Sequence, residues 1–119
     1  MIIVSWNINS FRIRLHHLKR LIDEVNQVVV CLQETKVVTE SFPYNAISDL
    51  GCPYQAAVGI KSYNGVAILS KYELSKTEVR NWCEKEDARH IFSTINYPDM
   101  GEVEVHNLYV PAGGDIPDI

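Results

Sequence analysis

The chain has 119 residues, of which 46% are hydrophobic, so it is long enough for one domain with a substantial core. Its formal charge of −4 excludes a protein that coats nucleic acid through bulk positive charge, although it leaves room for a local basic patch. The composition alone names no partner.

The first predicted elements are a strand, a helix and a second strand. Residues 2–8 are rich in β-branched and aromatic side chains, which predicts a strand. Between residues 11 and 25 apolar side chains recur every three or four positions, which predicts an amphipathic helix with Ser10 as its N-cap. Residues 27–33 predict a second strand, parallel to the first, because a helix of this length can return the chain across the sheet. The C-terminal ends of both strands should then meet at one edge.

After a loop and a short helix that ends at Gly51, the sequence predicts strands without intervening helices. The expected strands are residues 54–60, 65–70, 74–81, 90–97 and 103–110. Short polar connections indicate antiparallel pairing, so the predicted class is mixed α/β, dominated by sheet. The runs VVVCL and VAIL are apolar on both sides, which is typical of a sheet covered on both faces. Because one such helix covers one face, we expect further polypeptide to cover the other.

The cysteines and histidines form no disulfide or metal pattern. The cysteines, none of them in a C-x-x-C pair, are Cys31, Cys52 and Cys83. The histidines are His16 and His17 on the exposed helix stretch, and His90 and His106, isolated in strands. Neither a disulfide framework nor a zinc knuckle is indicated, which favours a reducing, cytoplasmic setting. No stretch approaches the length of a membrane span, so we expect no membrane partner.

Polar side chains follow the apolar runs of three strands. These are Asn7, Glu34 and Tyr109. Period-two alternation places Glu34 on the face of its strand that carries Leu32 and Val30. Side-chain oxygens with one negative charge at the rim of a sheet fit half of a Mg²⁺ site. Each residue also has an ordinary alternative role: Asn7 as a turn or cap residue, Glu34 as an exposed strand end, and Tyr109 as an amphipathic rim residue.

Five short stretches are more informative as sequence motifs than through the chemistry of their individual side chains. They are VSWNINSFR (4–12), LQETK (32–36), YNGVAILSK (63–71), ARHI (88–91) and NLYVPAGG (107–114). In this order and spacing they resemble the exonuclease III family of apurinic/apyrimidinic endonucleases, within the endonuclease/exonuclease/phosphatase superfamily. The resemblance implies a four-layer α/β sandwich. It also implies a Mg²⁺-dependent phosphodiesterase, with Mn²⁺ as a substitute, acting on double-stranded DNA at abasic sites and 3′ ends in base excision repair.

The resemblance also implies roles for particular residues. Glu34 matches the metal-binding glutamate, Asn7 the active-site asparagine that helps to hold metal and catalytic groups, and Tyr109 the tyrosine near the scissile phosphate. The residues expected to approach DNA are Arg89, Tyr63, Asn64 and Lys36. Ser10 stands where the family usually has glycine. Because serine is a good N-cap, we expect this departure to do little harm.

Motifs of the family's second half are absent from the chain. No Gly-Asp-x-Asn and no Ser-Asp-His is present. The family's domain commonly needs roughly 200–250 residues. We therefore interpret residues 1–119 as a partial domain, the N-terminal half of the sandwich, with little or no turnover alone.

Three functional hypotheses remain open from the sequence. The first is a segment of a DNA-repair nuclease that associates with a complementary C-terminal fragment or with itself. The second is a non-catalytic assembly partner or nucleic-acid-binding module. The third is a phosphatase acting on inositol or lipid phosphates, against which VPAGG and ARHI favour the nuclease branch by resemblance.

Overall fold

The computed structural model describes residues 2–25, 28–60, 65–81 and 88–110. The elements in chain order are β1 (Ile2–Asn7), η1 (Arg12–Arg14), α1 (Leu15–Glu24), β2 (Val28–Gln33), η2 (Thr39–Ser41), α2 (Tyr44–Leu50), β3 (Tyr54–Gly59), β4 (Gly65–Ser70), β5 (Leu74–Val79), β6 (His90–Tyr97) and β7 (Gly101–Leu108). No helix among these residues is long and apolar enough to cross a membrane.

The strands form two sheets. The first has the order β1-β2-β4-β3 and the second the order β5-β6-β7. β1 and β2 are parallel, as the strand–helix–strand pattern predicts, and every other pair is antiparallel. The parallel register sets Asn7 opposite Gln33, so the C-terminal ends of β1 and β2 do meet at one edge.

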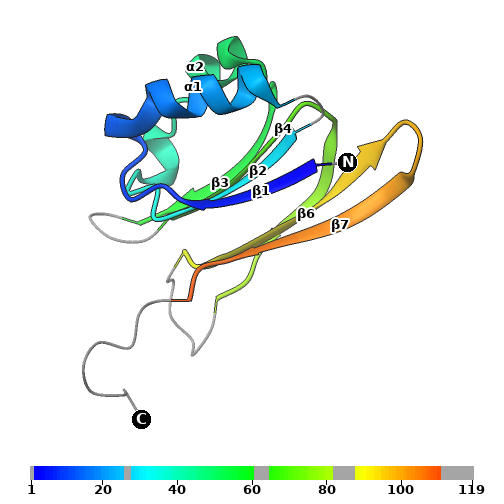
Figure 1. The fold of residues 1–119 in the computed structure, drawn as a ribbon. Coiled ribbons are helices and arrows are strands. Elements are labelled where there is room, and N and C mark those ends of the chain that lie inside the picture. The colour runs from blue at the N-terminus through cyan, green and yellow to red at the C-terminus, as the bar shows by residue number, and fades with distance from the viewer. Residues whose placement is uncertain (1, 26–27, 61–64, 82–87, 111–119) are drawn as a thin grey trace.

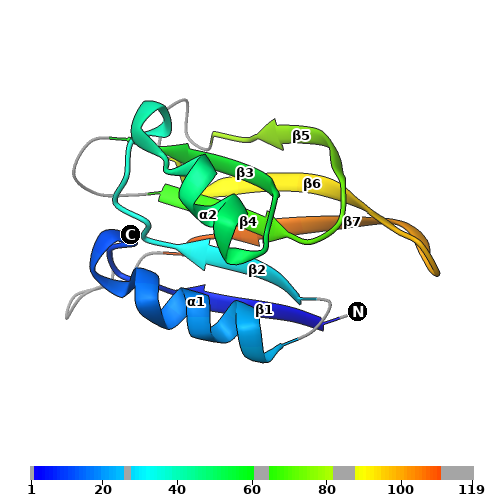
Figure 2. The ribbon, with the colours of Figure 1, turned by 90° about the horizontal axis from the view of Figure 1, so that it is seen from above.

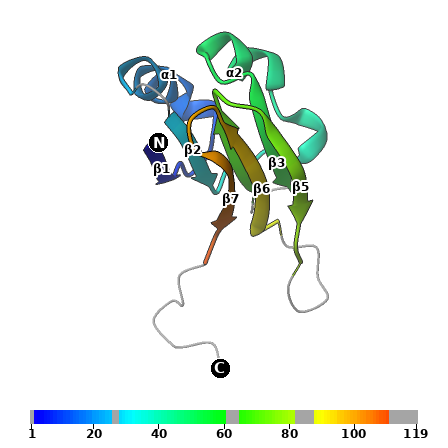
Figure 3. The same ribbon diagram turned by 90° about the vertical axis from the view of Figure 1, so that its right-hand side faces the viewer.

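The elements stack in three layers. Helices α1 and α2 lie together on one face of the four-stranded sheet, and β6 and β7 run along its other face (Figure 1). Seen from above, both helices lie over the first sheet (Figure 2), and an end-on view shows the order helices, sheet, sheet (Figure 3). The predicted α/β class is therefore confirmed, and the described residues supply three layers of the predicted four-layer sandwich.

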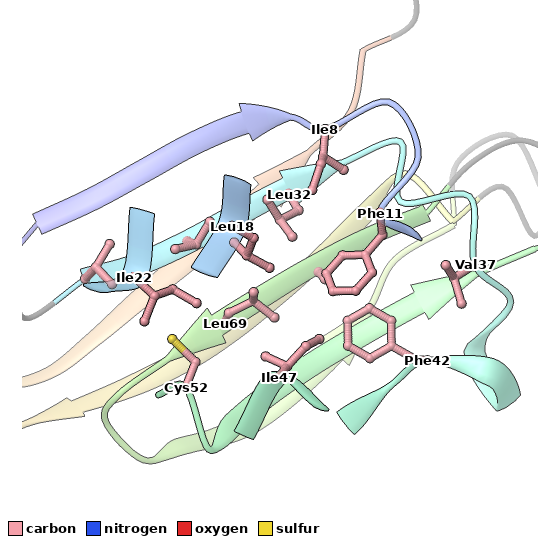
Figure 4. Packing of buried hydrophobic residues seen from close by; sticks show 13 residues of the cluster. Ile8, Phe11, Leu18, Ile22, Leu32, Val37, Phe42, Ile47, Cys52 and Leu69 are labelled. Atoms are coloured by element: carbon pink, nitrogen blue, oxygen red, sulfur yellow. The ribbon is translucent and has the colours of Figure 1, made fainter. Parts of the chain in front are cut away.

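Two hydrophobic cores hold the layers together. The core between the helices and the first sheet contains Phe11, Leu18 and Ile22 from the helical side, packed on Leu32 and Leu69 of the strands (Figure 4). The second core lies between the sheets. Its buried members are Val29, Cys31, Ala56, Val66, Ile68, Ile91, Ile95, Tyr97 and Val105. Because side chains alternate along a strand, β2 and β4 contribute to both cores and are buried along their whole length.

This arrangement corrects one expectation from the sequence. Further polypeptide is not needed to cover the second face of β2 and β4, because the chain's own second sheet already covers it. Strand β1 differs, since Ile2 and Ile3 remain 46% and 44% exposed at the sheet edge.

The start of the helix is also different from the prediction. Ser10 does not cap a helix: its φ is +83°, and α1 begins only at Leu15, after a 3-10 turn, with no side-chain capping bond at either start. The backbone N–H of Ser10 donates instead to the carbonyl of Glu34 (2.8 Å), and that of Phe11 donates to the carbonyl of Thr35 (2.9 Å). The segment after β1 is thus bound to the segment after β2, and this pairing displaces the helix start.

Candidate functional site

The two sheets meet at a pair of polar side chains just past the ends of β2 and β7. The hydroxyl of Tyr109 donates a hydrogen bond of 2.5 Å to Oε1 of Glu34, although 75 positions separate the two residues. Both side chains are half-buried. A contact of this length between a phenol and a carboxylate is a strong, charge-assisted hydrogen bond.

Glu34 reaches Tyr109 because its backbone breaks the strand alternation. Strict alternation would place Glu34 with Leu32 and Val30, on the face toward the helices. Its φ of +53° turns the chain instead, so that the carboxylate meets a residue packed against the core between the sheets. The face predicted for Glu34 from the sequence is therefore wrong, and the physical reason is this left-handed residue.

The phenol of Tyr109 is held in its protonated form. The hydrogen bond to Glu34, burial and the carboxylate charge raise the pKa of Tyr109, in that order, and the charge of Arg89 lowers it. Arg89 is a neighbour through the backbone as well, since its carbonyl accepts the N–H of Tyr109 at 2.7 Å. At neutral pH Tyr109 is therefore a hydrogen-bond donor.

A buried polar pair fixes the distance between the strands that carry these groups. Nε2 of Gln33 donates to Oδ1 of Asn107 (2.7 Å), and Nδ2 of Asn107 donates to the carbonyls of Leu32 and Ala67, both at 2.9 Å. Asn107 is only 2% exposed, so its side chain faces into the fold and is fully engaged there. It belongs to the support of the site rather than to the open rim.

The loops around the site hold several strained residues. Asn9, Ser10, Glu34 and Lys36 all have φ between +45° and +83°, where a residue other than glycine costs about 1–3 kcal/mol. The ammonium of Lys36 donates to Oδ1 of Asn9 at 2.7 Å, which links the two loops through their side chains as well. Such clustering of strain is typical of functional sites.

Gly65 allows these loops to lie against the start of β4. A Cβ at this position would lie 2.1 Å from Oγ1 of Thr35, far inside the contact distance of real atoms. Without a side chain, the carbonyl of Gly65 accepts the N–H of Thr35 at 3.1 Å. The segment that carries Glu34 is thereby fixed from the side of β4 as well.

The remaining site residues proposed from the sequence have different positions. Asn7 is exposed at the end of β1, on the face that carries Ile3 and Ser5 and lies toward the second sheet. Lys36 is exposed and Arg89 is half-buried. Tyr63 and Asn64 lie outside the described residues.

The donor set fits one side of a hard-cation site. Glu34 supplies a carboxylate and Asn7 an amide oxygen, which are ligands of the kind that Mg²⁺ takes. Over the described residues, no group of three or more His, Cys, Asp or Glu side chains is arranged to hold a metal. These residues therefore fit such an ion as a part of its coordination shell.

Sequence reasoning missed two groups of side chains. Nothing in the pattern marked Gln33 or Asn107 as a pair across the sheets, although the polar residue at the end of each apolar run was a usable signal. The prediction that His90 and His106 are isolated is wrong, because their rings are hydrogen bonded at 2.9 Å. The cause is the register of β6 and β7, which brings residues 16 positions apart together.

Comparison with known proteins agrees with this fold. Residues 4–115 match the Endonuclease/Exonuclease/phosphatase family. Exodeoxyribonuclease III of Haemophilus influenzae is 35% identical over 111 residues, which cover 92% of this chain and 41% of that protein. An AP endonuclease from Archaeoglobus fulgidus superposes with a TM-score of 0.80 at 34% identity, covering 93% of this chain and 42% of the other.

A third similar structure is that of a 3′ phosphatase from Neisseria bound to a product DNA hairpin, with a TM-score of 0.79 at 29% identity; the match covers 90% of this chain and 40% of that one. The chain thus spans about two fifths of the length of these relatives. The resemblance to exonuclease III-type AP endonucleases that the sequence predicts is confirmed, and the chain belongs to the endonuclease/exonuclease/phosphatase family.

Proposed function

We propose that this chain forms part of a Mg²⁺-dependent DNA phosphodiesterase that acts at abasic sites and at 3′ ends in base excision repair, with Mn²⁺ as a substitute ion. The observation that carries the proposal is the hydrogen bond between Tyr109 and Glu34, which joins two strand ends from different sheets at a strained, polar rim. The relatives named as an exodeoxyribonuclease, an AP endonuclease and a 3′ phosphatase support it.

The proposed roles follow from the chemistry of each group. The Glu34 carboxylate and the Asn7 amide oxygen would hold the ion, which when bound neutralises charge on the phosphate oxygens and the leaving group. Tyr109 keeps its proton and, through its single O–H, orients the Glu34 carboxylate at the rim. These tasks are positioning and electrostatic stabilisation.

DNA would present its sugar-phosphate backbone to the same rim. Arg89 and Lys36 carry the positive charge expected for phosphate contacts, and Tyr63 and Asn64 are proposed to contribute from the segment before β4. Arg89 is well suited, because its backbone is hydrogen bonded to Tyr109 and so has a fixed position relative to the site. A chain of net charge −4 would then bind DNA through a local patch.

We further propose that the chain alone has little or no turnover. It supplies one carboxylate and spans about two fifths of its relatives' length, and the Asp, Asn and His motifs expected from the family resemblance are not in its sequence. A missing general base alone lowers a rate by roughly 10²–10⁴.

The test is cleavage of a duplex with a single abasic site. With Mg²⁺, the chain alone should cleave little, and adding a polypeptide that covers the rest of a relative's length should produce cleavage beside the lesion. A chelator and Glu34→Gln should abolish this cleavage, and Glu40→Gln, at an exposed carboxylate of η2, should not. Brisk cleavage by the chain alone would contradict the proposed division of the site.

A second candidate function, as a non-catalytic assembly module, is favoured by the edges of the sheets. Among the described strands β1 pairs only with β2, and β7 only with β6. A cavity of about 440 Å³ lies between them, lined in part by Ile3, Gln33 and Leu108. This surface suits a complementary polypeptide or a second copy of the chain. Salt-dependent DNA binding that Glu34→Ala leaves unchanged, without cleavage in any mixture, would favour this alternative.

A further inference from the structure

A second cluster of titratable side chains lies on the opposite face of the second sheet. Nε2 of His90 and Nδ1 of His106 are 2.9 Å apart, from strands β6 and β7. Ile91 and Val105, their sequence neighbours, point into the core between the sheets, so the histidines point away from it. In Figure 3 this face lies on the far side of the molecule from α1 and α2. The cluster is thus separate from the Glu34–Tyr109 site.

A carboxylate orients one of the two rings. Oε1 of Glu104 lies 2.6 Å from Nε2 of His106, so that nitrogen carries the proton and donates to the carboxylate. The other nitrogen, Nδ1, then presents its lone pair to His90. A carboxylate that orients a histidine in this way is the usual outer partner of a histidine that binds a metal.

Aromatic packing holds the rings in place. The ring of Phe92 stacks on His106 with centroids 4.5 Å apart and an interplanar angle of 14°, and it lies 5.5 Å from His90. His90 is 4% exposed, whereas the side chains of His106 and Glu104 are 37% and 59% exposed. The rings are therefore ordered, and solvent has access from the side of His106.

We propose that His90 Nε2 and His106 Nδ1 form a site for a borderline transition-metal cation such as Zn²⁺, with Glu104 as the orienting carboxylate. Imidazole nitrogen is a preferred ligand of such ions, in contrast to the oxygen ligands that Mg²⁺ prefers. With Zn–N bonds of about 2.0–2.1 Å, the tetrahedral angle requires nitrogens roughly 3.3 Å apart. The observed pair has to open by only a few tenths of an ångström.

The proton balance of binding is simple. A neutral His90 that donates from Nε2 must shift its proton to Nδ1 so that Nε2 can bind the ion, and no net proton is released. Burial, His106 and Arg80, in that order, lower the pKa of His90, which favours the neutral ring that a metal requires. The described residues offer no third protein ligand, so solvent would complete the shell.

Arg80 opposes the ion and so gives a test of opposite sign. Its guanidinium carbon lies 5.1 Å from the centre of the Phe92 ring, on the same face. Glu104→Gln should weaken binding by about 10- to 100-fold, because an outer partner of a ligand is lost. Arg80→Gln should tighten it, because a nearby positive charge is removed.

The experiment is Zn²⁺ titration of the whole chain by calorimetry, together with ¹⁵N spectra of the histidine rings. We expect one Zn²⁺ per chain and ¹⁵N chemical-shift changes confined to the rings of His90 and His106. His106→Gln should lose this binding while keeping the circular dichroism spectrum of the parent. The matched control replaces His16 and His17 of α1, whose ring centroids lie 3.9 Å apart, by glutamine, and should leave binding unchanged.

Further variants distinguish this site from other possible metal sites on the chain. Glu34→Gln should not change Zn²⁺ binding, because the carboxylate at the proposed DNA-cleaving site lies on the other face of the second sheet. Absence of stoichiometric binding, its survival in folded His106→Gln, or its loss in Glu34→Gln or in the α1 control would each overturn the proposal. Zn²⁺ bound by cysteine thiolates would still bind to His106→Gln, because the cysteines are unchanged. The same variant therefore distinguishes the proposed histidine site from a thiolate site.

Discussion

The side chains of Gln33 and Asn107 are joined by a hydrogen bond of 2.7 Å in the interior between the two sheets. Gln33 directly precedes Glu34, and Asn107 lies two residues before Tyr109. The pair therefore links the strand ends that present the carboxylate and the phenol. Since Asn107 also holds the carbonyls of Leu32 and Ala67, it ties β7 to both central strands of the first sheet.

Replacing Asn107 by alanine should destabilise the fold strongly. The change removes one of the three hydrogen bonds of the Gln33 amide, which keeps Ser5 and the carbonyl of Cys31 as partners. It also deprives two buried carbonyls of their donor, and each such group costs about 1–3 kcal/mol. We expect a loss of roughly 2–5 kcal/mol in the free energy of unfolding, measured by urea denaturation.

The control for this variant is Asn96→Ala. Asn96 is the same residue type in the adjacent strand β6, but within the described part of the chain its side-chain amide makes one long bond, of 3.4 Å to Ser75. Its replacement should cost well under half as much. Equal losses in the two variants would mean that the pair between the sheets contributes nothing specific.

Glu34→Gln should lower the pKa of Tyr109 toward its ordinary value. The hydrogen bond and the charge of Glu34 are two of the causes that raise this pKa, and glutamine removes the charge. A phenol whose pKa is raised by folding contributes stability below its unfolded pKa, and this is lost as pH rises through the folded value. The free energy of unfolding of the parent should therefore fall more steeply with pH above about 10 than that of Glu34→Gln.

The titration can be followed by ultraviolet difference absorbance, with Tyr109→Phe identifying the signal of this residue. Tyr109→Phe should show no such steepening and should be insensitive to a further change at Glu34. A pKa of Tyr109 that does not move in Glu34→Gln would show that the charge of Glu34 does not raise it.

The order of elements could be predicted from the sequence because it depends on local pattern. The continuous apolar run of β2 and the short polar connections between β3 and β7 indicate the strands, and both the parallel and the antiparallel pairings follow from them. The strand pattern alone did not predict the second sheet as a cover for the first, because alternation along a strand says which residues share a face and not what that face meets. The family resemblance did imply it, as part of the four-layer sandwich.

The details of the site depended on long-range contacts that no local pattern contains. Glu34 could be singled out as the polar end of an apolar run, but its face could not, because its positive φ accompanies the bond from Ser10 to its carbonyl. The partnership of His90 with His106 depends on a strand register set by packing elsewhere in the sheet.

Ser10→Gly should stabilise the chain. Ser10 has a φ of +83° and makes no capping bond to the described residues, so its side chain brings strain of about 1–3 kcal/mol that no capping bond offsets there. Glycine relieves this strain but loses more chain entropy on folding, by roughly 0.5–1 kcal/mol. The expected net gain is about 1 kcal/mol in the free energy of unfolding, measured in urea.

The matched control is Ser41→Gly, at an exposed serine of η2 with ordinary helical geometry. Without strain to relieve, this change should destabilise by roughly 0.5–1 kcal/mol. Opposite signs for the two variants support the account of the turn after β1. A loss of stability in Ser10→Gly would show that the hydroxyl makes a contribution larger than the strain.

Gly65→Ala should destabilise the fold and disturb the segment that carries Glu34. The new Cβ would meet Oγ1 of Thr35 at 2.1 Å, so the loop after β2 must shift. Thr35→Ala removes that atom, and the double variant should therefore recover most of the loss, which gives a favourable coupling in a double-mutant cycle.

Gly101→Ala serves as control, because no atom lies within 4 Å of its Cβ and only its φ of +78° opposes a side chain. Additive effects of Gly65→Ala and Thr35→Ala would contradict the proposed clash, whereas strong coupling would show that the close approach of β4 fixes the position of Glu34.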